Sequence, residues 1–363
     1  MPKKRVDKGN LTYLLIIVAV LVVAVIFLAK NKKENVFEKP KAEQYINVSE
    51  ELKKADNFYN KGKYVRAIEV YKKVTQAEPQ NYAANIGLGR SFIALNILDE
   101  ALKTFQKTFS FRYYDYRSFY GLGLTYYSME NYPSAYYNLK QAYALNTNNQ
   151  GVASYLINTY NALGLYDEAI NLSQENLKKD TINSHHYRKI AVAYFFKNNF
   201  SKALENAKKA VEIDNAYAPN HLVLGIIYLS LNNQSALSEF KYALSFTQSN
   251  AAYESLAISY SLLSDSQNSD TNSKSASLQQ KHSFSLALLG FALLNAKQYD
   301  KAVNEFNSSI INTPNYYLPY KGLGKVYMAL GQKDKAVENL ERAWELNNLD
   351  KETKEMLGKL NSK

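Results

Sequence analysis

One alanine recurs along this chain at an almost constant interval, and this register limits the fold more than any other feature. The alanine follows a short polar turn, and successive copies lie 34 residues apart four times, then 33, 66 and 34 residues apart. The eight copies are Ala67, Ala101, Ala135, Ala169, Ala203, Ala236, Ala302 and Ala336. A period of this length indicates a repeat array, in which each repeat buries its core only against its neighbours.

Apolar residues keep fixed distances from this repeat alanine. Before Ala101, Leu88 and Gly89 lie thirteen and twelve residues away and Phe92 lies nine residues away, while Phe105 follows four residues later. Such spacings form one apolar stripe of a helix, and a small residue beside the stripe lets a second helix approach closely. Each repeat is therefore predicted to be a helix pair, and the recurring Gly-Leu-Gly triplets are interpreted as packing positions inside helices.

These offsets resemble the tetratricopeptide repeat, whose pattern is W-x2-L-G-x2-Y, then A-x3-F, then P. The leading Trp is missing, and Phe119, Tyr187 or Tyr320 stands in its place in three repeats. The resemblance covers roughly residues 48–348. It implies an all-α fold, a right-handed superhelical solenoid of antiparallel helix pairs.

The register divides the array into two blocks, at residues 48–263 and 281–350. Between them, residues 264–280 are polar, and no repeat alanine occurs where a second helix is due. This composition favours a decayed helix that has become a polar loop, while a hinge and a docking loop are the alternatives. Residues 351–363 carry the apolar residues expected of a short capping helix at the end of a solenoid.

An uncharged, apolar segment near the N-terminus predicts a membrane anchor. Residues 11–29 are nineteen residues without a charge. As a helix they would span roughly 28 Å, close to the thickness of the bilayer hydrocarbon. A basic tail at 1–10 precedes them and a charged linker at 30–47 follows. A cleaved signal peptide and a buried core helix are the alternatives, and the length of the apolar run favours a retained transmembrane helix.

The predicted fold is therefore a solenoid preceded by one transmembrane helix, and the predicted location is a bacterial inner membrane that the chain crosses once. Basic residues flank the apolar segment on both sides, so the positive-inside rule does not fix the orientation. A short N-terminal tail that stays inside would place the repeats on the extracytoplasmic side, which we favour.

The distribution of charge and the numbers of cysteine and histidine residues narrow the classes of function that are open to this chain. Nine basic and three acidic residues within 1–41 account for +6 of the net charge of +11, which leaves only +5 for the remaining chain. This excess is small for a nucleic-acid partner. The chain has no cysteine and four histidines, and the adjacent His185 and His186 point apart on a helix. No catalytic residue, metal ligand or cofactor is predicted, and we do not expect an enzyme.

The first helix of each pair is expected to line a groove. The groove face is predicted eighteen, fifteen, eleven and eight residues before each repeat alanine. Only seven arginines occur against 37 lysines, yet three arginines fall on this face. Arginine offers a planar fork to carboxylates and stacks on aromatic rings. The predicted partner-binding residues are Arg90, Ile93, Arg117, Tyr120, Tyr127, Asn158, Asn161, Arg188 and Phe195.

Together these features predict a non-catalytic scaffold that is tethered to a membrane through residues 11–29. It would bind a protein or peptide, an acidic one being favoured by the arginines, in envelope assembly or secretion. A helical repeat protein that binds nucleic acid or anionic lipid is the rival function. Self-association into a homo-oligomer through a tyrosine-rich segment such as 109–116 is a third alternative.

Overall fold

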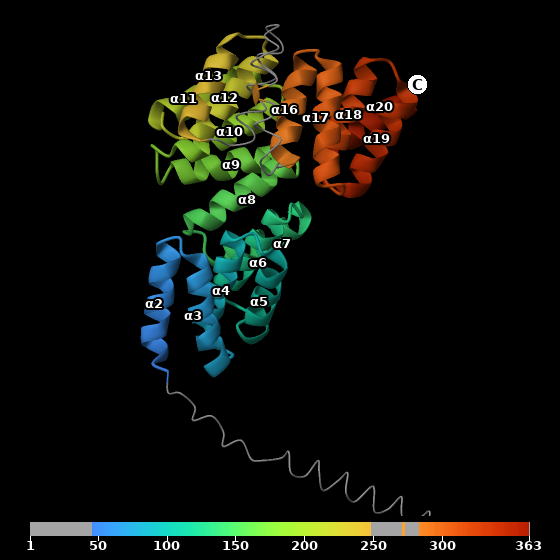
Figure 1. The fold of residues 1–363 in the computed structure, drawn as a ribbon. Helices are drawn as coiled ribbons and strands as arrows, with labels where there is room; N and C mark the ends of the chain where they lie inside the picture. The colour runs from blue at the N-terminus through green and yellow to red at the C-terminus, as the bar shows by residue number, and fades with distance from the viewer. Residues whose placement is uncertain (1–45, 248–270, 273–282, 363) are drawn as a thin grey trace, which may run out of the picture. The chain divides into compact units, whose positions relative to one another are not determined.

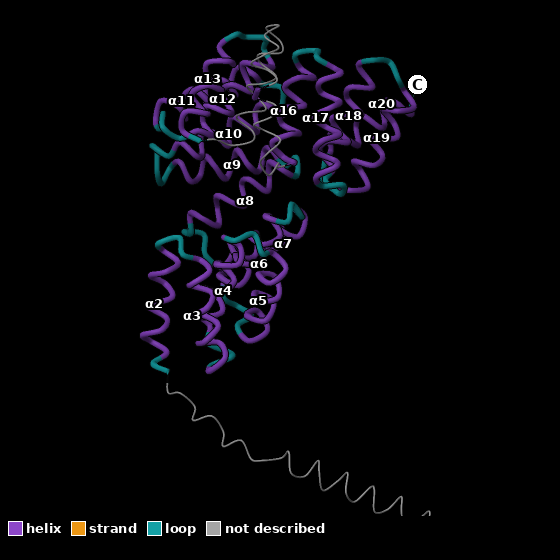
Figure 2. The backbone as a smooth tube through the Cα atoms, in the orientation of Figure 1, coloured by secondary structure: helices purple, strands orange, loops and turns teal. Residues whose placement is uncertain are grey.

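The computed structural model describes residues 46–247, 271–272 and 283–362. The elements with bounds inside these described ranges are all α-helices (Figure 1 and Figure 2). The first range contains α2 (Val48–Asn60), α3 (Tyr64–Ala77), α4 (Tyr82–Ala94), α5 (Leu98–Phe111), α6 (Tyr116–Ser128), α7 (Tyr132–Leu145), α8 (Gln150–Ala162), α9 (Tyr166–Leu177), α10 (Ser184–Phe196), α11 (Phe200–Ile213), α12 (Ala218–Ser230) and α13 (Ser235–Phe246). The last range contains α16 (Ser283–Asn295), α17 (Tyr299–Asn312), α18 (Tyr317–Ala329), α19 (Lys333–Leu346) and α20 (Lys351–Asn361).

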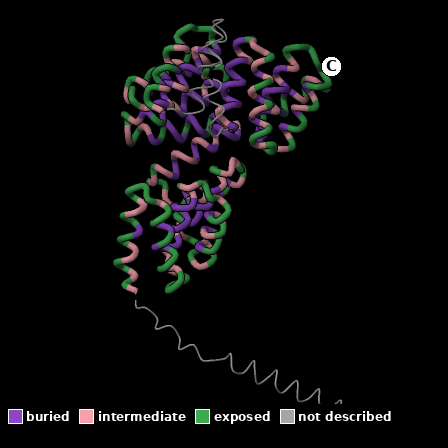
Figure 3. The backbone as a smooth tube through the Cα atoms, viewed as in Figure 1, coloured by how far each residue is buried: buried purple, intermediate pink, exposed green. Residues whose placement is uncertain are grey.

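Consecutive helices pack side by side, the second helix of one pair against the first helix of the next. The repeat alanines all lie on second helices, and none of the eight is more than 4% exposed. Their small side chains let the two helices approach closely. Figure 3 shows buried residues along the helix faces that meet one another. The prediction of all-α helix pairs is therefore confirmed for the described residues.

One residue in the turn of each pair adopts the left-handed backbone conformation. Its φ lies between 53° and 75° at Gly62, Asn96, Glu130, Gly164, Asn198, Asn232, Lys297 and Gly331. Glycine enters this region without steric cost, whereas a residue with a Cβ atom is strained there. Apart from Asn232, each of these residues lies five positions before a repeat alanine. The turns therefore carry the same register as the helices.

Glycines in the first helices make room for aromatic rings of the second helices. A Cβ atom on Gly89 of α4 would lie 2.6 Å from the ring of Phe105 in α5, and one on Gly121 of α6 would lie 2.1 Å from the same ring. Both distances are shorter than van der Waals contact between carbon atoms, which is about 3.5–4.0 Å. The fully buried Phe105 ring fits between α4 and α6 because neither position carries a side chain. The interpretation of the Gly-Leu-Gly triplets as packing positions is confirmed.

Helices that are far apart in the chain also pack together. The ring of Tyr316 lies 5.0 Å from that of Tyr132, measured between centroids, and its hydroxyl donates to the carbonyl oxygen of Ala162 at 3.4 Å. The side-chain amide of Asn347 donates to the carbonyl oxygen of Leu163 at 2.9 Å. An array in which each repeat contacts only its neighbours would not make these contacts. The second block of helices thus shares a core with the middle of the first block.

A buried charge cluster links α20 to α18. The Nζ atom of Lys321 lies 2.8 Å from a carboxylate oxygen of Asp350 and 2.7 Å from one of Glu352, and the Lys321 side chain is 1% exposed. Glu352 also meets Lys325. Burial alone would lower the pKa of Lys321, but Tyr166, Asp350 and Glu352 outweigh it and raise that pKa. The lysine is therefore held in its charged form inside the protein.

The predicted transmembrane helix requires a correction. Across the described ranges, no helix is long and apolar enough to cross a membrane. A helix of 14 residues such as α3 extends only about 21 Å, less than the roughly 30 Å of bilayer hydrocarbon. The segment that motivated the prediction, residues 11–29, lies outside the described residues, as does 264–280 apart from 271–272. The fold is therefore stated without a transmembrane helix, and the predicted single-pass location in a bacterial inner membrane is withdrawn with it.

Candidate partner-binding site

The predicted partner-binding residues fall into two separate hollows. Arg90, Ile93, Arg117 and Tyr120 line the first, which we call the N-terminal groove and which is formed by first helices α4, α6 and α8 together with Tyr59 of α2. Tyr127, Asn158, Asn161 and Arg188 line the second, which we call the central pocket and which is formed by α6, α8, α10, α12 and α16. Phe195 belongs to neither hollow. It is 2% exposed and packs in the core against Phe196 and Phe200.

Stacked arginines and tyrosines dominate the N-terminal groove. The guanidinium of Arg90 lies over the ring of Tyr59 at 4.5 Å, and that of Arg117 lies over Tyr82 at 4.6 Å. Arg112 stacks on the same Tyr82 ring at 4.7 Å. Each stack places a planar cation on an aromatic face, which is favourable electrostatically and restricts the side chain. The groove therefore presents arginines whose positions are set before any partner arrives.

Arg117 already has a carboxylate partner within the chain. Asp115 caps the N-terminus of α6 by accepting from the backbone N–H of Arg117, and it accepts from the guanidinium at 3.0 and 2.7 Å. Burial by itself raises the pKa of Asp115, but the hydrogen bonds from Arg117 outweigh it and lower that pKa to about 2. The fork of Arg117 is thus largely occupied, which makes it a weaker candidate for partner contact than its position suggested.

Arg90 has no such partner. Its side chain is exposed, and no carboxylate of the described residues forms an ion pair with it. The wall beside it is aromatic, because Tyr120 and Tyr155 lie with ring centroids 6.3 Å apart. Burial raises the pKa of Tyr120 to about 12, so its hydroxyl keeps its proton. The groove has a volume of about 490 Å³ and offers one unpaired guanidinium beside phenol rings.

Three tyrosines that line the groove, Tyr59, Tyr116 and Tyr155, were missed by the sequence prediction. Tyr59 lies eight residues before Ala67, at the same offset as Ile93 before Ala101, so the repeat register could have identified it. Tyr82 lies outside the four predicted offsets and supports Arg112 and Arg117 from beneath. The register could also have identified it, because Tyr82, Tyr116 and Tyr317 all lie nineteen residues before a repeat alanine.

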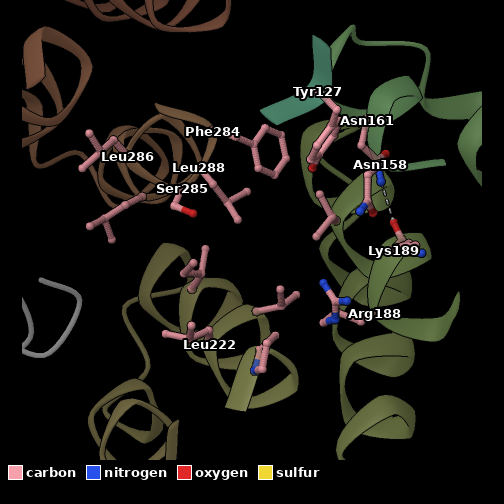
Figure 4. A pocket seen from close by; sticks show the side chains of 15 residues that line it. Tyr127, Asn158, Asn161, Arg188, Lys189, Leu222, Phe284, Ser285, Leu286 and Leu288 are labelled. Atoms are coloured by element: carbon pink, nitrogen blue, oxygen red, sulfur yellow. Dashed lines mark hydrogen bonds between the residues drawn. The ribbon is translucent and has the colours of Figure 1, made fainter. Parts of the chain in front are cut away.

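The central pocket has a polar side and an apolar side, and Figure 4 shows both. Tyr127, Asn158 and Arg188 project from the repeats of the first block, and Phe284 and Leu288 face them from α16. The amide of Asn161 donates to the carbonyl oxygen of Lys189 at 3.1 Å, while its Oδ1 atom is buried without a hydrogen-bond partner. The pocket is much smaller than the groove, with a volume of about 180 Å³.

Two cations lie at the polar side of the central pocket. Burial lowers the pKa of Arg188 and lowers that of Lys189 well below its ordinary value, and the Arg188 charge acts on Lys189 in the same direction. The Nζ atom of Lys189 donates to the carbonyl oxygen of Ser154 at 3.1 Å and to the Ser154 hydroxyl. Arg188 stacks on Tyr217 at 5.5 Å, and its buried Nε atom has no acceptor.

A metal site has no support among the residues that the structure describes. No group of three or more His, Asp or Glu side chains there could hold a metal ion. The two adjacent histidines differ in environment: His186 is 3% exposed, whereas His185 is exposed and packs on Tyr217.

Comparisons with known proteins agree with the repeat register. Residues 59–109, 187–217 and 322–348 match models of the tetratricopeptide repeat. A search of curated protein sequences returns no match. Solved structures with a similar fold include human IFIT1, described as a dimer with PPP-AAAA, at 18% identity and a TM-score of 0.50 over 78% of this chain and 69% of that one.

Two further solved structures are similar over smaller parts of the chain. The MamA protein is 25% identical, with a TM-score of 0.41 over 46% of this chain and 92% of that one. TTC0263, a tetratricopeptide-repeat protein of Thermus thermophilus, is 18% identical, with a TM-score of 0.39 over 58% of this chain and 98% of that one. Arrays of this kind are scaffolds for protein–protein interaction, with extended binding surfaces. The three matched segments and the buried repeat alanines show that the chain contains tetratricopeptide repeats.

Proposed function

We propose that this chain is a non-catalytic scaffold that recruits a partner protein by binding an extended, acidic segment of it in the N-terminal groove. One observation carries the proposal: Arg90 is exposed, stacked on Tyr59, and unpaired by any carboxylate of the described residues. A guanidinium that is already positioned loses little freedom when it binds, and its planar fork matches a carboxylate.

The rest of the groove suits a peptide. Ile86, Ile93 and Leu124 provide apolar contacts, and Tyr120 and Tyr155 provide rigid aromatic surface beside Arg90. Tyrosine and arginine are the residue types that most often dominate the energy of a protein interface. An apolar or aromatic side chain next to an Asp or Glu would therefore satisfy both kinds of surface in one short segment.

Nucleic acid is the less favoured occupant. Beyond residue 41 the chain carries 35 basic and 30 acidic residues, and a protein that binds nucleic acid chiefly through phosphates needs a denser basic surface. Within the groove, Asp115 also neutralises Arg117. These two facts weaken the rival function, and the experiment below separates the two.

The proposal can be tested by selecting displayed peptides on the full chain and measuring their affinities by fluorescence anisotropy. We expect the selected peptides to combine Asp or Glu with an apolar or aromatic residue. Arg90→Glu should weaken their binding by about 30-fold or more, the effect of losing an interface hot spot of about 2 kcal/mol. Arg66→Glu is the matched control, because Arg66 is exposed on second helix α3 and does not line the groove.

Two results would count against this function. Peptides that bind Arg90→Glu as tightly as the wild-type chain would show that the groove is not their site. Single-stranded RNA that binds with a steep dependence on salt and competes with the peptides would favour the nucleic-acid function instead.

A further inference from the structure

We propose that the central pocket is a binding site for a small organic anion, a carboxylate carried on a compact apolar group. This site is separate from the N-terminal groove and does not rest on the function proposed for that groove. It is defined by Arg188 and Asn161 at its polar side and by Leu222, Val223, Phe284 and Leu288 at its apolar side.

The polar side holds a cation without a counterion. No carboxylate of the described residues forms an ion pair with Arg188 or Lys189, and the groups that bear on Arg188 electrostatically are the phenols of Tyr217 and Tyr127. Lys189 is engaged by Ser154, so its Nζ atom is satisfied within the protein. Arg188 keeps a buried Nε–H with no acceptor. A desolvated charge with an unused donor is costly unless an anion pairs with it.

Asn161 supplies a second unsatisfied group. Its side chain is 3% exposed, and its Oδ1 atom has no hydrogen-bond donor in the described residues, although its Nδ2 atom donates to Lys189. Figure 4 shows Asn161 and Asn158 on the same wall of the pocket as Arg188. A carboxylate can accept from the guanidinium of Arg188 and from a side-chain N–H of Asn158, whereas the Oδ1 atom of Asn161 needs a donor, which a carboxylate does not supply. Two buried polar groups without partners on one wall indicate a place that is built for a polar ligand.

The apolar side limits the rest of the ligand. Val223 and Leu288 are buried, Leu222 and Phe284 are half-buried, and these four side chains come from α12 and α16. Charged or strongly polar groups would lose their hydration here without compensation. The ligand is therefore expected to be amphiphilic, with its anionic end at Arg188 and its hydrocarbon end between α12 and α16.

The volume of the central pocket limits the size of the ligand. The pocket encloses about 180 Å³, slightly more than a protein cavity of about 150 Å³ that accommodates benzene. An apolar group of about six carbon atoms is the largest that fits comfortably by this comparison. Hexanoate has the required charge and size, and hexanamide is its neutral counterpart of nearly equal shape.

The test is a saturation-transfer NMR titration of the full chain with hexanoate and with hexanamide at constant ionic strength. We expect hexanoate to bind saturably and at least about tenfold more tightly than hexanamide, since a hydrogen bond to a charged group contributes about 1.5–3 kcal/mol. Arg188→Gln should reduce hexanoate affinity by about 10-fold or more and should bring the two ligands close to equal affinity. Arg66→Gln is the matched control, because Arg66 is exposed on α3 and lines neither the central pocket nor the N-terminal groove, and it should leave hexanoate binding unchanged.

A second variant guards against misfolding of Arg188→Gln. Ser285 is a half-buried residue that lines the pocket from α16, so Ser285→Leu should fill the cavity and abolish binding while Arg188 stays in place. A peptide ending in a free Leu carboxylate, compared with its C-terminal amide, identifies the source of the carboxylate: tighter Arg188-dependent binding of the peptide acid would assign the site to a protein terminus. Equal affinity for hexanoate and hexanamide, or hexanoate binding that survives both Arg188→Gln and Ser285→Leu, would overturn the proposal. So would no detectable binding of either ligand by the wild-type chain.

Discussion

Replacing Lys321 with Met should destabilise the C-terminal helices more than any surface change. Lys321 is 1% exposed, and its ammonium lies within 2.8 Å of Asp350 and 2.7 Å of Glu352. Removing one partner of a buried ion pair costs about 3–5 kcal/mol because the other charge remains buried. Glu352 is 37% exposed and keeps Lys325, whereas Asp350 is 3% exposed. We therefore expect the lower end, about 3 kcal/mol.

The chain contains a local reporter for this change. Its single Trp, Trp344, lies on α19, and Lys354 of α20 lies over the indole ring at 5.8 Å. Urea unfolding followed by Trp fluorescence therefore reports on the C-terminal helices, whereas circular dichroism reports on the whole array. With a slope of about 2 kcal/mol/M, a loss of about 3 kcal/mol lowers the fluorescence midpoint by about 1.5 M urea. Hydrogen exchange should accelerate in α18–α20 and stay unchanged in α3–α5, because repeats unfold locally.

Two controls separate the charge from the side chain. Lys333→Met makes the same substitution at an exposed position of α19 and should shift stability by less than about 0.5 kcal/mol. Combining Lys321→Met with Asp350→Asn removes the uncompensated buried charge, while Glu352 keeps Lys325 as its partner, and should recover much of the loss. A loss of stability below about 1 kcal/mol for Lys321→Met alone would refute the reasoning, because removing one partner of a buried ion pair should cost about 3–5 kcal/mol.

Two further predictions concern acid and backbone strain. Lys321 and Lys325 outweigh the opposing effect of burial and lower the pKa of Glu352 from 4.5 to about 2. The ion pairs of Glu352 should therefore contribute fully to folding stability above pH 4.5, and this contribution should be lost as the pH falls towards 2. The difference in urea midpoint between the wild-type chain and Glu352→Gln should shrink over that range, and a constant difference would contradict the assignment. Lys297 has a φ of 60°, so Lys297→Gly should raise the midpoint by an amount equivalent to about 0.5–1 kcal/mol. Gly331 lies at the matching turn, and an added Cβ there would have nothing within 4 Å, so Gly331→Lys should lower the urea midpoint through backbone strain alone. If Lys297→Gly and Gly331→Lys shift the midpoint in the same direction, strain is excluded as the cause.

The parts of the fold that depend on local spacing were predictable. Gly89 and Phe105 meet across helices that are adjacent in sequence, so a fixed offset describes the contact. The contacts of the second block with the first were not predictable in this way. Tyr316 and Ala162 are 154 residues apart, and Asn347 and Leu163 are 184 apart. No period relates such pairs, because they arise from the packing of whole blocks and not from one repeat against the next.

The same distinction, between contacts of neighbouring residues and contacts of distant segments, applies to the candidate site. The register correctly places Arg90 and Arg117 in one groove, since both lie on the same face of first helices. It could not show that Asp115, two residues before Arg117, folds back onto the guanidinium as part of a helix cap. It also could not show that Arg188 would be enclosed by α16, whose position depends on contacts between distant segments.

The residues eight positions before each repeat alanine show how one helix face can serve two purposes. Tyr59 and Ile93 are half-buried and line the N-terminal groove. Asn161 and Phe195, at the same offset in later repeats, are only 3% and 2% exposed. The difference follows from α16, which packs on α12 and brings Phe291 to 5.3 Å from Phe196. Where the second block covers this face it becomes core with an enclosed polar pocket. The proposed partner segment is therefore expected at the first repeats, where no carboxylate of the described residues pairs with Arg90.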